Sequence, residues 1–249
     1  MKKIDFKKIL TTSMFAVTSF MLFGVNVPTI VKVQKEPVKI LKDLTDAQKD
    51  AVAWADVAAG LTSAETGPAS LLIAAATSMY VYKAYVAENG KLIASGGFNP
   101  KSNPITSNNY GEIHNQICLT YYNLNINTIN FADVVSAGIL AKPDLKSEFN
   151  SLSEQVFNEK VNWAKAQDLS TTQKQLDLIL SIITLNQNDI ITVRSSLEQI
   201  QNSSTITEHT NSVNAFIGLI PTFDTQESNK VKLTNAFEIL KHSYILWAQ

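Results

Sequence analysis

The sequence predicts an all-α protein, and three observations support this prediction. Of 249 residues only 9 are Gly and 7 are Pro, too few for a sandwich or barrel built from many tight turns. Apolar residues recur at steps of three and four through most of the second half of the chain. Hydrophobic residues make up 45% and charged residues 17%, which excludes both a disordered chain and a long solvated coiled coil.

Residues 1–27 are expected to form a signal peptide or an N-terminal anchor helix. The start of the chain is basic, with Lys2, Lys3, Lys7 and Lys8. No charged residue follows from Ile9 to Val31, so residues 9–31 are the segment expected to contact the membrane. Cleavage near Gly24 to Asn26 and retention as an uncleaved anchor both remain open, since the uncharged run is long enough to cross a bilayer. We therefore expect an exported protein that is periplasmic, envelope-associated or secreted.

Residues 28–45 are expected to be a linker. Pro28 and Pro37 interrupt this stretch, in which Val31 and Val33 alternate with lysines. Beyond it, Cys118 is the only cysteine of the chain. An exported product therefore cannot form an intramolecular disulfide, and its core must hold without one.

Residues 46–95 are expected to form a small-residue helical segment. Thr45 and Gln48 have the spacing of a capping box, which predicts a helix that runs to about Leu61. Pro68 restarts a second helix after an interruption over residues 62–67. Residues 80–95 either continue that helix or turn a hairpin at Asn89-Gly90; the Ala-rich composition favours the helix.

The second small-residue helix allows two interpretations. Ala, Ser and Thr side chains let helices approach closely, both in the centre of a bundle and within lipid. Residues 69–85 therefore either fill a tight core or insert into a bilayer. Asp56, Glu65 and Lys83 disfavour the second interpretation, because charged residues are costly in a spanning helix.

Residues 96–108 are expected to be a loop, and residues 109–249 an antiparallel helical bundle. The loop contains Gly96-Gly97, Pro100 and Pro104. Three apolar stripes follow it: Leu145, Phe149, Leu152, Val156 and Trp163; Leu176, Ile179, Ile183, Ile190, Val193, Leu197 and Ile200; and Leu233, Phe237, Leu240, Tyr244 and Trp247. Each stripe lies on one helix face and needs a partner, so the helices are expected to pack on one another.

Four breaks divide this bundle. They fall at Lys142-Pro143, at Leu169-Ser170, at residues 186–189 and around Pro221. The third, which is polar, is either a true break or a solvated turn within one long helix. No internal repeat of fixed period is present in the sequence, which disfavours a solenoid.

Glu112, His114 and Asn115 form a candidate polar site at the start of a helix. Glu112 suits the positive end of the helix dipole, and a His beside an Asn can orient a ligand or act as a base. His114 and Cys118 are four residues apart on one helix face, which would suit a thiol site or half a zinc site. A zinc site needs two more ligands, so neither a metal nor a cofactor is predicted. Alternatively, His114 and Asn115 satisfy backbone groups of the preceding loop.

Tyr110, Tyr121 and Tyr122 form a candidate ligand groove. They belong to a group of tyrosines between residues 80 and 122, and such side chains line binding grooves. The alternative is that they close the wet edge of the core, with apolar rings inside and hydroxyls in water.

Several short motifs occur between residues 54 and 116: Trp54-Ala55-Asp56, Gly67-Pro68-Ala69, Asn99-Pro100, Asn103-Pro104 and Gly111-Glu112-Ile113-His114-Asn115-Gln116. Together they resemble a group of uncharacterised exported bacterial proteins. Proteins of that group combine a bacteriocin-like Gly/Ala-rich segment with a Gly-x-x-His-Asn helix start. The resemblance covers about 65 residues, and this chain has Ala, Ser and Thr where such segments are richer in Gly. It implies export but supplies no established activity.

The expected function is that of an exported, non-catalytic binding or interaction module whose partner is an unknown protein or small ligand. With 21 Lys and Arg against 22 Asp and Glu, the chain lacks the basic character expected of a nucleic-acid-binding protein. The sequence contains no phosphate-binding loop and no Gly-x-Ser-x-Gly or His-Glu-x-x-His motif. Alternatives are a membrane-active bacteriocin-like protein that inserts residues 69–85, and an enzyme that uses His114.

Overall fold

The computed structural model describes residues 44–88, 104–123 and 128–248, which contain helices and their connections and no strand. The all-α prediction is confirmed for these ranges. The predicted signal or anchor at 1–27, most of the linker, and residues 89–103 with the hairpin turn lie outside the described residues. All described helices belong to one compact unit, residues 36–249.

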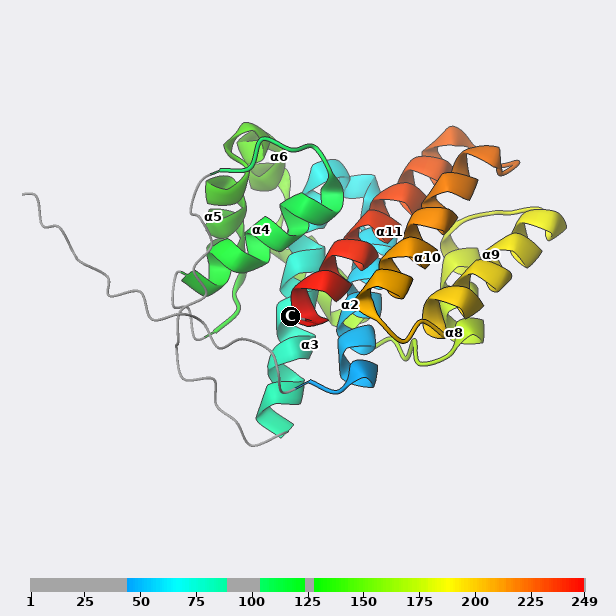
Figure 1. Ribbon diagram of the computed structural model, residues 1–249. Helices are drawn as coiled ribbons and strands as arrows, with labels where there is room; N and C mark the ends of the chain where they lie inside the picture. The colour runs from blue at the N-terminus through cyan, green and yellow to red at the C-terminus, as the bar shows by residue number, and fades with distance from the viewer. Residues whose placement is uncertain (1–43, 89–103, 124–127, 249) are drawn as a thin grey trace, which may run out of the picture. The chain divides into compact units, whose positions relative to one another are not determined.

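The described residues form ten α-helices and three short 3-10 helices (Figure 1). In chain order these are α2 (Asp46–Thr62), η1 (Ala64–Ala69), α3 (Ser70–Glu88), α4 (Tyr110–Asn123), α5 (Phe131–Ala141), η2 (Pro143–Leu145), α6 (Lys146–Ser151), α7 (Glu154–Lys165), α8 (Thr172–Ile182), α9 (Gln187–Gln201), α10 (Ile206–Leu219), η3 (Ile220–Thr222) and α11 (Glu227–Ala248). The helix interpretation of residues 80–88 is confirmed, since α3 continues to Glu88.

Helices α2 and α3 lie at the centre of the unit. Every residue from Val52 to Leu61 and from Leu71 to Met79 is buried. Helix α2 packs against α3, α7 and α11, and α3 packs against α2, α4 and α7. A helix that is enclosed on all sides needs apolar or small residues around its whole circumference, which this Ala-rich pair provides. The two helices expected at 46–95 therefore share a core with the later helices.

The remaining helices surround this pair. Helix α4 packs against α11, α3 and α5, and α11 packs along α2. Helices α8, α9, α10 and α11 follow one another, each packed on the next (Figure 1). Helix η1 between α2 and α3 contains Gly67, whose positive φ of 60° suits a residue without a β-carbon. This turn is the interruption predicted over residues 62–67.

Side-chain caps set where the helices begin. The predicted capping box is confirmed: Thr45 Oγ1 accepts from the Gln48 N–H at 3.3 Å, and Gln48 Oε1 accepts from the Thr45 N–H at 3.0 Å. The N-caps of the later helices include Asn130, Ser153, Thr171, Asn186 and Thr205. The polar stretch at 186–189 is a true break, because Asn186 caps a new helix.

The stripe from Leu145 to Trp163 does not lie on one helix. Helix α6 ends at Ser151, Leu152 is extended, and Ser153 caps α7 in a new rotational phase. Helix α7 buries Phe157, Val161 and Ala164 instead, while Trp163 is 39% exposed. The prediction that Trp163 belongs to the buried stripe is therefore wrong, because an extended residue resets the helical periodicity.

We predict different stability losses for two truncations on α7. Phe157→Ala removes a ring that is 1% exposed and should lower the free energy of unfolding by about 3–5 kcal/mol. Trp163→Ala should cost less than about 1 kcal/mol, as is usual for surface positions. Urea unfolding of both purified variants, followed by circular dichroism at 222 nm, measures the difference. Equal losses would contradict the assignment of the α7 faces.

Candidate functional site

A buried polar cluster joins four helices at the centre of the protein. Its members are Asp56 from α2, Ser78 from α3, His114 from α4, and Ser243 and Trp247 from α11. Asp56, Ser78, His114 and Ser243 are fully buried. Polar groups in such a position must find partners within the protein, because no water solvates them.

One oxygen of Asp56 makes most of these contacts. Ser78 Oγ donates to Asp56 Oδ2 at 2.8 Å, and Ser243 Oγ donates to the same oxygen. His114 Nε2 lies 3.4 Å from Oδ2. Trp247 Nε1 donates to Ser78 Oγ at 2.8 Å, so the indole holds the Ser78 hydroxyl in place. Asp56 Oδ1 is buried and has no hydrogen-bond partner among the residues that the structure describes. A single carboxyl oxygen thus connects α2, α3, α4 and α11.

Asn115 determines which nitrogen of His114 carries a proton. Asn115 Nδ2 donates to the His242 carbonyl oxygen at 2.7 Å, which orients the carboxamide. Asn115 Oδ1 then faces His114 Nδ1 at 3.0 Å. A carboxamide oxygen only accepts, so Nδ1 is protonated and Nε2 faces Asp56.

Burial shifts the pKa values of both members of the pair toward their neutral forms. It raises the pKa of Asp56 well above its usual range, against the hydrogen bonds from Ser243 and Ser78. It lowers the pKa of His114 to about 4. Burial therefore favours the state in which the pair carries no net charge, with one proton between Asp56 and His114 Nε2.

Cys118 lies beside His114 in an arrangement that does not generate a thiolate. Its Sγ is 3.8 Å from His114 Nε2, and the thiol donates to the Ala75 carbonyl oxygen at 3.9 Å. Burial, followed by the charge of Asp56, raises the pKa of the thiol well above its usual range. Cys118, His114 and Asn115 have the residue types of a cysteine-hydrolase site, but this protonated thiol has no access to solvent. The group serves packing.

Gly111 lets the start of α4 approach α11 closely. A β-carbon at Gly111 would overlap with the Glu238 carbonyl group and lie 2.5 Å from Cδ2 of His242. Asn109 secures the same crossing, because its Nδ2 donates to Glu238 Oε2 at 2.9 Å and its Oδ1 accepts from the Glu112 N–H at 3.1 Å. The motif Gly111-x-x-His114-Asn115 therefore docks α4 onto α11 and brings His114 to Asp56 of α2.

The structure brings together only part of the predicted polar site. His114 and Asn115 are adjacent and bonded, whereas Glu112 is half-buried and contributes its backbone N–H to the Asn109 cap. Asn115 donates to α11 rather than to the preceding loop. The described part of that loop is held by other contacts: Ile105 N–H to the Ala141 carbonyl oxygen at 2.9 Å, and Lys142 Nζ to Asn108 Oδ1 at 3.2 Å.

The three tyrosines of the predicted groove do not lie together. Tyr110 begins α4 and Tyr121 is near its end, about 16 Å away along the helix axis. Tyr121 is buried and donates to the Thr128 carbonyl oxygen at 2.7 Å. Tyr122 packs edge-to-face against Tyr82 and Trp247, with ring centroids 6.2 and 6.3 Å apart. Tyr121 and Tyr122 thus take part in aromatic packing at one end of α4.

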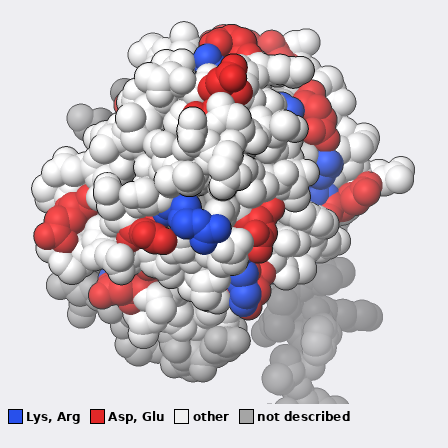
Figure 2. All heavy atoms as spheres, turned by 90° about the vertical axis from the view of Figure 1, so that its right-hand side faces the viewer, with Lys and Arg blue, Asp and Glu red and all other residues white. Residues whose placement is uncertain are grey.

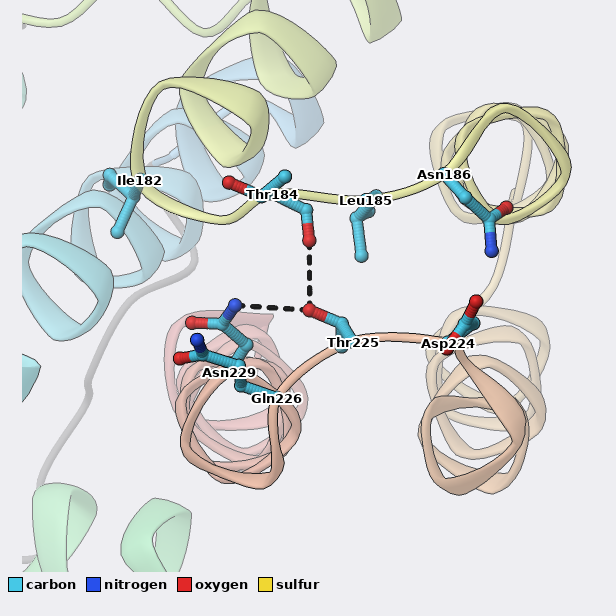
Figure 3. Close-up of a pocket in the computed structure, with 8 residues that line it drawn as sticks. All are labelled: Ile182, Thr184, Leu185, Asn186, Asp224, Thr225, Gln226 and Asn229. Atoms are coloured by element: carbon cyan, nitrogen blue, oxygen red, sulfur yellow. Dashed lines mark hydrogen bonds between the residues drawn. The ribbon is translucent and has the colours of Figure 1, made fainter.

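A polar hollow of about 600 Å³ lies between the α8–α9 connection and the start of α11 (Figure 3). Its lining residues are Ile182, Thr184, Leu185, Asn186, Asp224, Thr225, Gln226 and Asn229. Thr225 Oγ1 donates to the Thr184 carbonyl oxygen at 2.8 Å and accepts from Asn229 Nδ2 at 3.0 Å. This hollow could not be predicted from the sequence, because its two walls are about 40 residues apart; the available signals were the polar breaks at 186–189 and near Pro221.

Among the described ranges, no group of three or more His, Cys, Asp or Glu side chains is arranged to hold a metal ion. Comparisons of the chain with family models, with curated proteins and with solved structures found no match.

We predict that an added methyl group has opposite effects at two glycines. Gly111→Ala should lower the free energy of unfolding by about 3 kcal/mol, because the new β-carbon meets the α11 backbone. Gly218→Ala on α10 meets nothing within 4 Å and should raise it by about 0.5–1 kcal/mol through helix propensity. Urea unfolding of both variants tests this, and an undiminished stability of Gly111→Ala would contradict the close crossing.

His209 makes the free energy of unfolding depend on pH in acid. His209 is 2% exposed and stacks on Tyr244 with ring centroids 3.7 Å apart, and burial lowers its pKa to about 4. The unfolded chain binds a proton at this residue below about pH 6.5, while the folded chain does not until about pH 4. Above pH 6.5 the burial of neutral His209 therefore costs no free energy of unfolding. As the pH falls below this value, the free energy of unfolding decreases, by about 2 kcal/mol at pH 5.

His209→Phe keeps an aromatic ring against Tyr244 and removes the titrating group. The fall in unfolding free energy between pH 7 and pH 5 should be smaller in this variant by about 2 kcal/mol. Other titrating groups, such as Asp50, are common to both proteins and cancel in the comparison. An identical fall in the wild type and the variant would contradict the assignment.

Proposed function

We propose that this chain is an exported, non-catalytic binding or interaction module of the cell envelope or the extracellular space. The export part of the proposal is supported by the charge order of the N-terminus, where four lysines precede an uncharged stretch from Ile9 to Val31. The single cysteine is compatible with an oxidising compartment, since it is buried inside the core.

The proposed non-catalytic role is supported by the positions of the reactive side chains, which take part in packing. His114 and Cys118 lie inside the four-helix junction and are fully buried, and Asn115 links α4 to α11. A catalytic acid, base or nucleophile must reach the reacting atoms of a substrate. These residues instead contact one another and the backbone of neighbouring helices.

The binding part is supported by the exposed surface of the later helices. Figure 2 shows the side on which α8 and α9 lie in Figure 1, where residues other than Lys, Arg, Asp and Glu cover most of the surface and acidic and basic side chains are interspersed. The described ranges contain eleven Lys and Arg against nineteen Asp and Glu, which disfavours nucleic acid. The hollow of Figure 3 offers carboxamides and the Asp224 carboxylate to a polar small ligand or a protein partner.

The burial of α3 favours this proposal over bilayer insertion. Residues 71–79 are core residues, so insertion would require α3 to leave its contacts with α2, α4 and α7. Within residues 44–88, 104–123 and 128–248, no helix has the length and apolar character needed to span a membrane.

We predict that the N-terminal lysines direct export. Combined substitution of Lys2, Lys3, Lys7 and Lys8 by Glu should leave most of the protein in the cytoplasm, because a basic start orients the apolar segment. The matched control is Lys146→Glu with Lys174→Glu, two exposed positions, which should be exported as the wild type is. Cell fractionation with mass spectrometry of the first residue measures both. Wild-type protein found in the cytosol with Met1 attached would overturn the proposal.

A second experiment separates binding from membrane activity. The purified protein should bind the native envelope fraction saturably and leave dye-filled liposomes intact at micromolar concentration. Leakage would favour the bacteriocin-like alternative, and an absence of saturable binding would contradict the interaction role.

A further inference from the structure

We propose that Asp56 and His114 hold one shared proton that keeps α4 docked, and that loss of this proton at alkaline pH releases α4 from α3 and α11. This inference does not depend on the proposed function, since it concerns the packing of the described helices.

The geometry fixes the number of protons in the pair. Asn115 Oδ1 requires a proton on His114 Nδ1, so the contact of 3.4 Å between Nε2 and Asp56 Oδ2 holds one further proton or none. With one proton, on the oxygen or on the nitrogen, the pair has no net charge. With none, a carboxylate faces the lone pair of Nε2 inside the core, and both residues are fully buried.

Among the described residues, the surroundings of the pair supply no replacement cation. Helix α3 presents the Ser78 hydroxyl and the Ala74 carbonyl oxygen, which accepts from the His114 ring, and α11 presents Ser243 and Trp247 as uncharged donors. The described titratable groups that face the pair are Cys118 on α4 and His242 on α11. Burial raises the pKa of Cys118 and lowers that of His242, so both are neutral at mildly alkaline pH. Asp56 Oδ1 has no partner, so an ionised carboxyl would be poorly compensated.

Helix α4 is the element that the missing proton would release. Its polar ties to α2 and α11 include His114 to Asp56, Asn115 to the His242 carbonyl oxygen and, from the residue before the helix, Asn109 to Glu238. Helix α2 is held independently by α3, α7 and α11. An unpaired carboxylate on α2 therefore acts against the His114 side chain, and through it against the packing of α4 on α3 and α11.

The docking equilibrium of α4 depends on pH wherever the docked and undocked states bind different numbers of protons. In the undocked state both side chains meet water and regain ordinary pKa values, about 3.9 for Asp and about 6.5 for His. Between these values docked and undocked states each hold one proton, so docking is independent of pH. Above about pH 6.5 only the docked state keeps the proton, and the docking equilibrium falls about tenfold per pH unit.

Hydrogen–deuterium exchange of the full-length purified protein tests this proposal. After correction for intrinsic exchange rates, amides of α4 should open more frequently at pH 8.5 than at pH 6.5, by up to about a hundredfold. Amides of α9, which contacts α8 and α10, should not change in parallel. Protection of α4 that is independent of pH would overturn the proposal, and this measurement needs no variant.

Asp56→Asn is the informative variant. Its carboxamide oxygen accepts from Ser78 and Ser243, and its nitrogen donates to His114 Nε2, which reproduces the protonated carboxyl. Helix α4 should then stay protected at both pH values. Asp177→Asn, an exposed position on α8, is the matched control and should keep the wild-type pH dependence. An unchanged pH response in Asp56→Asn would also overturn the proposal; if this variant fails to fold, the wild-type comparison decides.

Discussion

The rest of the structure depends on a carboxyl group buried where four helices meet. Asp56 is held by Ser78, Ser243 and His114, which are 22, 187 and 58 residues away in the sequence. Burying such a group is costly unless it is paired and hydrogen-bonded, so the cluster favours the one arrangement that brings all four helices to the same point. The helices are also joined by apolar contacts, which tolerate sliding more readily than a hydrogen bond does.

The small residues of α2 and α3 make this junction possible. Ala53, Ala58 and Ala59 on α2, like residues 74–76 on α3, are fully buried and keep the helix axes close. Close helices allow a side chain as short as Ser to reach Asp56. Small side chains, however, form shallow ridges that specify helix register poorly, since knobs and grooves of similar size fit at several positions. In our interpretation the polar cluster supplies the register that the Ala-rich surfaces leave undefined.

Features that depend on neighbouring residues could be predicted from the sequence, and features that depend on distant ones could not. The capping box at Thr45 and the buried stripe of α11 follow from spacings of three and four residues. The breaks at Lys142-Pro143, at Leu169-Ser170 and around Pro221 follow from proline and polar residues, whereas the sequence left the break at 186–189 open. Trp163 was misplaced because one extended residue, Leu152, resets the helical phase. His114 and Asn115 were singled out by residue type, but their partners on α2 and α11 lie far along the chain. In the sequence, Asp56 is notable as part of the Trp54-Ala55-Asp56 motif and as unsuited to a membrane-spanning helix, and neither feature points to its partners on α3, α4 and α11.

Because the chain has a single cysteine, the buried cluster takes the place of a disulfide cross-link between its helices. With one cysteine, residues 36–249 have no intramolecular disulfide to hold α4 against α11. The Gly111-x-x-His114-Asn115 motif fulfils that task by non-covalent means: the glycine permits contact, the asparagine bonds to the α11 backbone, and the histidine meets Asp56. A disulfide restricts the unfolded chain irrespective of pH, whereas a proton-sharing pair is stable only while the proton is present. Stability that responds to pH is thus a physical consequence of using a buried acid and a histidine as the cross-link.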